Sequence, residues 1–187
     1  MAERVRVTFD TDVRRRRLAI LLRIVLAIPP ALVLVLWTVL AAPALVLAWI
    51  ATLVRGRTPR PLHRFLHGYL RYFGQFDAWW SLVSGSYPRL RGRDRHPVQL
   101  EARRERQARL STLLRVVLAL PGLVLASVLG VVLALSGIAA WFVALMRGRT
   151  TDGLRELGAF CVRYQVEVLA YVLLLTARAP RLESPEA

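Results

Sequence analysis

The chain has 187 residues, of which 56% are hydrophobic, and a formal net charge of +15. Both values are high for one soluble domain, since soluble proteins are about 45–50% apolar. Charged and apolar residues are also separated into blocks, which excludes an ordinary mixed surface. The basic residues, all arginine, flank apolar runs. This position disfavours nucleic-acid binding and favours contact with anionic lipid headgroups.

The chain consists of two copies of one sequence pattern. Placing Arg17 on Arg109 aligns the halves without a gap, so that RLAILLRIVLAIP matches RLSTLLRVVLALP. The later matches are RGRT at 55–58 and 147–150, RY at 71–72 and 163–164, and PRL at 88–90 and 180–182. Self-similarity at a fixed spacing indicates a tandem duplication. We therefore divide the chain into a basic N-terminal segment (1–16), membrane repeat 1 (17–90), a charged linker (91–108), membrane repeat 2 (109–182) and a tail (183–187).

The first predicted element of each repeat is a long hydrophobic helix. Residues 24–54 and 116–146 carry no charged side chain, and each run exceeds the ~20 residues that cross a bilayer core. A proline, Pro29 or Pro121, predicts a kink near the start of the helix because it removes a helix hydrogen bond. A re-entrant hairpin that turns at Pro43 is the alternative.

A tight turn and an amphipathic helix follow in each repeat. Glycine between arginines predicts the turn, with Thr58 and Thr150 as the N-caps of the next helix. That helix either lies on the membrane surface or crosses with Arg71 or Arg163 turned toward the protein interior. Crossing is favoured, because the terminal and linker arginines then share one side, as the positive-inside rule requires.

The expected fold is therefore an all-α integral membrane protein. A tandem duplication supplies a kinked hydrophobic helix and an amphipathic helix in each repeat, giving four membrane-associated spans, with two spans as the alternative. Both repeats are expected to start on the same side. We expect a multi-pass protein of the bacterial cytoplasmic (inner) membrane with cytoplasmic termini.

No residue pattern indicates a reaction. His63 and His67 have a metal-compatible spacing, but no acidic or cysteine ligand accompanies them nearby. Asp77 is the one acid in the membrane region of repeat 1, and its counterpart in repeat 2 is Leu169. We therefore predict no catalytic residue, no metal, no cofactor and no enzymatic activity.

Arginines are the candidate contacts for lipid headgroups or for an interface. Arginine suits both tasks because its guanidinium binds phosphate and carboxylate groups in a bidentate manner. Arg163 also precedes Glu167 by one helical turn, which predicts an ion pair on the helix face. The candidate contacts are Arg23, Arg55, Arg57, Arg71, Arg115, Arg147, Arg149 and Arg163.

The ordered motifs RLxxLLRxVLAxP, W-x5-RGRT, RY and PRL resemble a bacterial membrane family catalogued as domain of unknown function 4389 and common in actinobacteria. The resemblance covers both repeats. Family members often show a Gly-Arg-Tyr-Pro turn, in which Thr58 and Thr150 here replace the aromatic residue and Thr151 replaces the proline. The resemblance implies an integral membrane protein with no assigned reaction, and it transfers no catalytic residue.

The favoured function is a non-enzymatic, lipid-contacting scaffold or an accessory subunit of a membrane complex. Its expected partners are anionic membrane lipids, an unknown membrane protein or a second copy of the chain, and not nucleic acid. A small channel or transporter is the alternative, for which the pore candidates are Thr38, Thr52, Ser127 and Ser136. A lipid-modifying enzyme that uses Asp77 or His67 is the third hypothesis.

Overall fold

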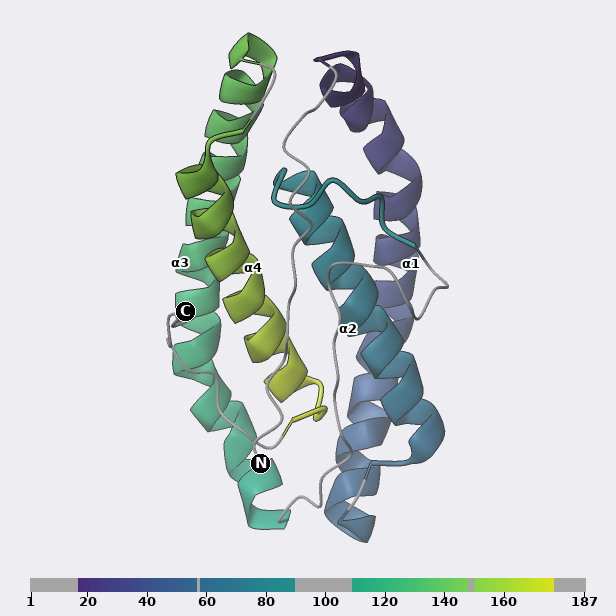
Figure 1. Ribbon diagram of the computed structural model, residues 1–187. Helices are drawn as coiled ribbons and strands as arrows, with labels where there is room; N and C mark the ends of the chain where they lie inside the picture. The colour runs from purple at the N-terminus through teal and green to yellow at the C-terminus, as the bar shows by residue number, and fades with distance from the viewer. Residues whose placement is uncertain (1–16, 57, 90–108, 148–149, 177–187) are drawn as a thin grey trace, which may run out of the picture.

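The computed structural model describes residues 17–56, 58–89, 109–147 and 150–176, with the side chains of residues 17–21, 55 and 109–118 left out. This part of the chain is all-helical (Figure 1). Its helices are α1 (Arg17–Arg55), α2 (Arg60–Trp80), α3 (Arg109–Arg147) and α4 (Asp152–Val172). Each repeat thus contributes one long helix and one shorter helix, as the sequence predicts.

The long helices run without interruption through their prolines. The α1 helix contains Pro29, Pro30 and Pro43 and still extends over 39 residues. The alternative of a hairpin at Pro43 is therefore wrong. A proline cannot donate to the carbonyl four residues earlier, which leaves the Leu26 oxygen without a bond from Pro30. The Tyr87 hydroxyl donates to that oxygen at 3.1 Å, so a side chain from beyond α2 replaces the missing helix bond.

The turn between α1 and α2 depends on Gly56, which has a φ of 66°. Glycine adopts this conformation without steric cost. The predicted threonine caps are wrong, because α2 is capped by Pro59 and α4 by Thr151, both without a side-chain hydrogen bond. Thr58 turns inward instead, and its hydroxyl lies 3.1 Å from the buried Thr52 hydroxyl of α1.

The α2 and α4 helices end in the same way, on a leucine with left-handed backbone. Leu82 has a φ of 62° and Leu174 a φ of 60°, a conformation that costs a non-glycine residue about 1–2 kcal/mol. Each leucine side chain is only 1% exposed. Burial of an apolar side chain of this size contributes about 1.5–3 kcal/mol, which offsets the backbone cost in both repeats.

The four helices form two layers, with α2 and α4 in front of α1 and α3 (Figure 1). The α1 helix packs on α2 and α3, and α4 packs on α3 and α2. Leucine and valine side chains between the layers, among them Leu66, Leu70, Val162 and Val166, are fully buried.

The two repeats run in opposite directions. The α1 helix starts at the end of the bundle where α3 finishes (Figure 1). Accordingly, the rings of Trp80 at the end of α2 and Trp141 near the end of α3 are 5.7 Å apart. The two repeats therefore start at opposite ends of the bundle, whereas the expected crossing arrangement has them start at the same end. An approximate two-fold relation lets the same stripe of α2 and α4 bury against its own counterpart, as in a symmetric dimer.

The outer faces of α1 and α3 are apolar and exposed. Within Leu22–Val54 of α1, only 17% of the most hydrophobic 18-residue stretch is buried inside the protein. The corresponding value for Ala119–Arg147 of α3 is 22%. The core helix of a soluble protein would be mostly buried. Both helices are long and apolar enough to cross a membrane.

Candidate functional site

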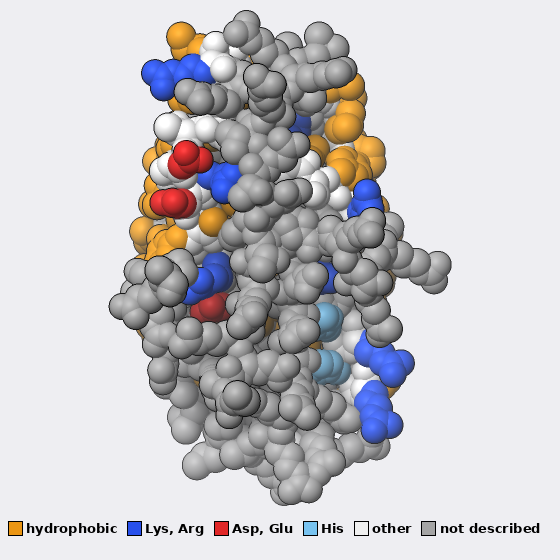
Figure 2. Space-filling view, in the orientation of Figure 1, with side chains coloured by type: hydrophobic (Ala, Val, Ile, Leu, Met, Phe, Trp, Pro, Cys, Tyr) orange, Lys and Arg blue, Asp and Glu red, His pale blue; other side chains and the backbone are white. Residues whose placement is uncertain are grey.

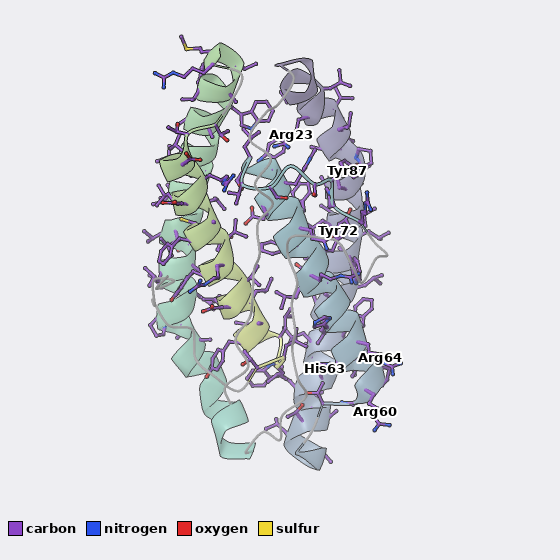
Figure 3. The ribbon with its side chains drawn as sticks, viewed as in Figure 1. Arg23, Arg60, His63, Arg64, Tyr72 and Tyr87 are labelled. Carbon is purple, nitrogen blue, oxygen red and sulfur yellow. The ribbon has the colours of Figure 1, made fainter. Side chains whose placement is uncertain are left out.

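Arg23 of α1 is directed into the protein. Its guanidinium donates to the Trp79 carbonyl oxygen at 2.7 Å and lies 4.7 Å from the centre of the Trp79 ring. The side chain is 6% exposed. The Trp79 carbonyl oxygen also accepts the Leu82 N–H at 3.2 Å, and the helix dipole favours a cation at the last turn of α2. Figure 3 shows Arg23 beside the start of α1, far from Arg60 and Arg64 at the other end of α2.

The other candidate arginines do not gather into one site. Arg71 and Arg163 are half-buried on α2 and α4, and Arg147 is exposed at the end of α3. The predicted ion pair is confirmed, with Arg163 Nε 3.6 Å from Glu167 Oε1. The remaining candidates lie outside the described residues or side chains: Arg55, Arg57, Arg115 and Arg149.

The front layer is polar on its outer face. Charged side chains and histidines gather over α2 and α4, while hydrophobic side chains occupy the flanks (Figure 2). The exposed charged residues in this layer include Arg60 and Arg64 on α2 and Asp152 and Glu156 on α4. The two layers therefore present surfaces of opposite character.

His63 and His67 stack on one face of α2, with ring centres 6.4 Å apart. Among the residues that the structure describes, no three His, Cys, Asp or Glu side chains come together to hold a metal ion. His67 and Asp77 are ten positions apart on the same helix, which is ~15 Å at 1.5 Å per residue. The two residues named for the lipid-modifying enzyme therefore lie in different parts of α2.

A cavity of about 610 Å³ lies where the start of α1, the end of α2 and the second half of α3 meet. Its walls are mainly apolar and aromatic, with Trp80 and Trp141 among them. Its polar side chains are Asp77 and Ser81 of α2 and Gln165 of α4. This volume is within the ~300–1,000 Å³ that is typical of small-molecule sites.

Asp77 is the ionisable group of this cavity. Its Oδ2 is buried and has no hydrogen-bond partner within the described part of the chain. The Ser81 hydroxyl donates to the backbone carbonyl of Asp77 at 2.6 Å and not to the carboxyl group. Burial raises the pKa of the Asp77 carboxyl to about 7. Burial and, second, the Asp77 charge raise the pKa of the Cys161 thiol on α4.

A family model described as Domain of unknown function (DUF4389) matches residues 17–90 and again residues 109–182. The chain belongs to the DUF4389 family. No curated protein and no solved structure matches it. In this chain each DUF4389 repeat comprises one long apolar helix, a connecting segment with the sequence RGRT and one amphipathic helix that is followed by a left-handed leucine.

The cavity between the DUF4389 repeats is the feature that sequence reasoning missed. Asp77 stands out in the sequence as an acid in one repeat only, which argued against a role in the shared design. The same difference is the signal for a site that only one end of the bundle carries. Finding that site requires the antiparallel packing, because four different helices supply the wall.

Proposed function

We propose that the protein is a non-enzymatic integral membrane protein that lies in the plane of one leaflet and serves as a lipid-contacting scaffold or accessory subunit. The outer faces of α1 and α3 lie among the acyl chains, and α2 and α4 face water. The observation that carries this proposal is the difference between the two layers. Large apolar side chains are exposed along α1 and α3, whereas arginines and acids are exposed on α2 and α4.

The length of the apolar surface supports the in-plane placement. The apolar segment of α1, Leu22–Val54, has 33 residues, or about 50 Å of helix at 1.5 Å per residue. A hydrocarbon core is about 30 Å thick. A straight helix of this length would need a tilt beyond the ~40° at which spanning helices are found. In the membrane plane the whole apolar face is covered without a mismatch.

The charges of the front layer support the same placement. Because α2 lies along α1 and α4 along α3, all four helices cross the membrane together or none does. Crossing would carry the half-buried Arg71 and the Arg163–Glu167 pair to the middle of the bilayer. One charge at that depth costs about 2.5–3.5 kcal/mol on insertion scales. In the plane of the membrane these groups remain at the aqueous surface.

The opposite directions of the repeats add a third argument. The α1 and α3 helices finish at opposite ends of the bundle, and in the sequence each is followed by the basic segment RGRT. A crossing bundle would therefore place basic turns on both sides of the membrane, against the positive-inside rule. An in-plane bundle brings both turns to the headgroup layer of one leaflet, where arginines contact anionic phosphates.

The four hydroxyl residues that were named as pore candidates do not support a channel or transporter. Each donates to a carbonyl oxygen of its own helix at 2.6–3.0 Å and is already satisfied. Such bonds are typical of hydroxyls within apolar helices. These donors are Thr38, Thr52, Ser127 and Ser136.

Cysteine labelling distinguishes the two placements. Arg60 and Asp152 are exposed and begin α2 and α4, at opposite ends of the bundle. We would introduce Arg60→Cys and Asp152→Cys separately into a Cys161→Ser background and reconstitute each variant in sealed vesicles. A membrane-impermeant maleimide is then added from outside, with and without detergent. In-plane placement predicts that both cysteines react to the same extent from the same side.

The matched control is Leu36→Cys on the exposed apolar face of α1. It should resist the impermeant reagent and, once labelled with a fluorophore in detergent, be quenched by nitroxide lipids after reconstitution. Protection of either Arg60→Cys or Asp152→Cys from outside, while the other reacts, would establish a crossing multi-pass bundle and overturn the in-plane placement.

A further inference from the structure

The cavity beside Asp77 marks a difference between two ends of an otherwise duplicated bundle. We call the end where α1 begins the cavity end and the opposite end the filled end. The two-fold relation gives every wall residue of the cavity a counterpart at the filled end. Four polar or small wall residues have larger, apolar counterparts, namely Asp77 with Leu169, Ser81 with Leu173, Gln165 with Phe73, and Gly137 with Leu45; Gly130 corresponds to Thr38 and Ala134 to Ala42.

Three of these four counterparts belong to the packed interior. Leu173 is in the core cluster, and Leu45 and Leu169 pack against it. At the cavity end, a Cβ added to Gly137 would meet only Ser81, at 3.7 Å. A Cβ added to Gly130 would lie 3.4 Å from the Gln165 amide nitrogen. Small residues on α3 therefore leave the space open, although a larger residue is accommodated at the equivalent place.

The unpartnered carboxyl group is the costly part of this arrangement. A buried polar group without a hydrogen-bond partner costs about 1–3 kcal/mol, and more when it is charged. A leucine in the same position of repeat 2 avoids that cost. A molecule from outside the chain could supply the hydrogen-bond partner that the Asp77 carboxyl group lacks. The complement of a carboxylate is a cationic donor.

The rest of the wall defines the body of such a partner. The rings of Trp80 and Trp141 are tilted toward each other with centres 5.7 Å apart, and indole faces attract organic cations. Ile24, Ile138 and Phe142 line the cavity and are also exposed on α1 and α3. The cavity is thus continuous with the apolar surface, so an apolar molecule can reach it from there.

We propose that this cavity binds a lipid-soluble organic amine, whose ammonium group pairs with the Asp77 carboxylate and whose apolar body lies between Trp80, Trp141 and Gly137. The carboxylate supplies the selectivity for a cation, and the aromatic and aliphatic walls supply most of the contact area. The route from the lipid rests on the proposed membrane placement, but binding itself does not.

Tryptophan quenching in detergent micelles tests the site. The full chain is titrated with 11-bromoundecylamine, because bromine quenches an indole that it touches, and 11-bromoundecanol serves as the neutral probe. We expect saturable quenching by the amine and at least tenfold weaker quenching by the alcohol. Asp77→Leu and Asp77→Asn should both reduce amine affinity at least tenfold and remove its advantage over the alcohol.

Two further variants separate the pocket from general partitioning. Gly137→Leu introduces the residue of the filled end and should weaken both probes, whereas Glu156→Gln removes an exposed acid of α4 and should change neither. Helical circular dichroism confirms that each variant is folded. Equal binding of amine and alcohol to the wild type, or amine binding that survives both Asp77 variants, would overturn the proposal. The quenching assay contains no bilayer, so its outcome does not depend on how the protein is placed in a membrane. Failure of the amine-binding proposal can therefore be distinguished from failure of the proposed membrane placement, which cysteine labelling tests.

Discussion

The filled end and the cavity end of the bundle follow one plan but differ in how their interior is completed. At the filled end, Leu66 of α2 is fully buried in the core. Its counterpart at the cavity end is Gly158, where an added Cβ would come within 2.5 Å of Val83 Cγ2. A leucine fills this place at the filled end, whereas at the cavity end the backbone of α4 and Val83 come together over a glycine. The comparison shows that backbone architecture is shared while the interior is specific to each end.

The largest expected effect is the loss of core packing at the filled end. Leu66→Ala should destabilise the protein by about 2–5 kcal/mol, because it leaves a cavity in a fully buried site. Thermal and denaturant unfolding in detergent would measure the loss. Leu157→Ala, which truncates an exposed leucine of α4, is the matched control and should cost less than ~1 kcal/mol. A similar loss for both variants would contradict the assigned core.

Exchanging Asp77 and its counterpart Leu169 between the two ends tests whether the Asp77 carboxyl group lowers the stability of the protein. Asp77→Leu should raise stability by about 1–3 kcal/mol, because it removes a buried polar group that has no partner. The reciprocal change, Leu169→Asp, should lower stability by at least as much at the filled end. The same unfolding assays measure both. If Asp77→Leu proved destabilising, the carboxyl group would have a structural partner and the comparison would fail.

A pH titration of stability sharpens the same point. The folded pKa of Asp77 is about 7, against 3.8 for the unperturbed group. Between these values the unfolded chain releases a proton that the folded chain retains, so stability falls as the pH rises from about 4 to about 7. Two other ionisable groups of the neighbouring helices bear on this titration. Cys161 of α4 interacts electrostatically with Asp77, and the Arg23 guanidinium of α1 is hydrogen-bonded to the Trp79 carbonyl. Melting temperatures from pH 4 to 8 should show this decline, and Asp77→Asn should remove it.

The smallest effect is expected from the ion pair on α4. Glu167→Gln introduces the residue that repeat 1 carries at Gln75. Since the pair is partly exposed and within one helix, its removal should cost only about 0.2–0.5 kcal/mol. Melting at low and high salt would measure it. A loss above ~1 kcal/mol would mean that Arg163 is indispensable to repeat 2 in a way that repeat 1 does not share.

The helices and their order along the chain were predictable from the sequence, whereas the relative direction of the two repeats was not. The duplicated motifs and the uncharged runs predict four helices in two repeats, and the spacing of Arg163 and Glu167 predicts their pair. Helix direction depends on which faces bury each other in three dimensions, so charge counting did not reveal that the repeats run in opposite directions. Arg23 was expected to contact a lipid headgroup or an interface, and its contact with Trp79 arises only because α2 folds back along α1.

The candidate site was less predictable than the fold for the same reason. Ile24, Asp77, Gly137 and Gln165 are separated by long stretches of sequence and meet only through antiparallel packing. Their residue types do not predict that they share one cavity. The informative sign was the mismatch between copies, which becomes meaningful once the two-fold relation is known.

The two-fold relation between the repeats also bears on stoichiometry. A chain with a single repeat would bury its α2 stripe against a second copy, and such a symmetric dimer must carry two acids or none. Joining the copies in one chain keeps them at high effective concentration and frees each half to diverge. Asp77 in one repeat and Leu169 in the other are one such difference. One chain is therefore expected to hold a single amine, at one end, although its backbone offers two equivalent places.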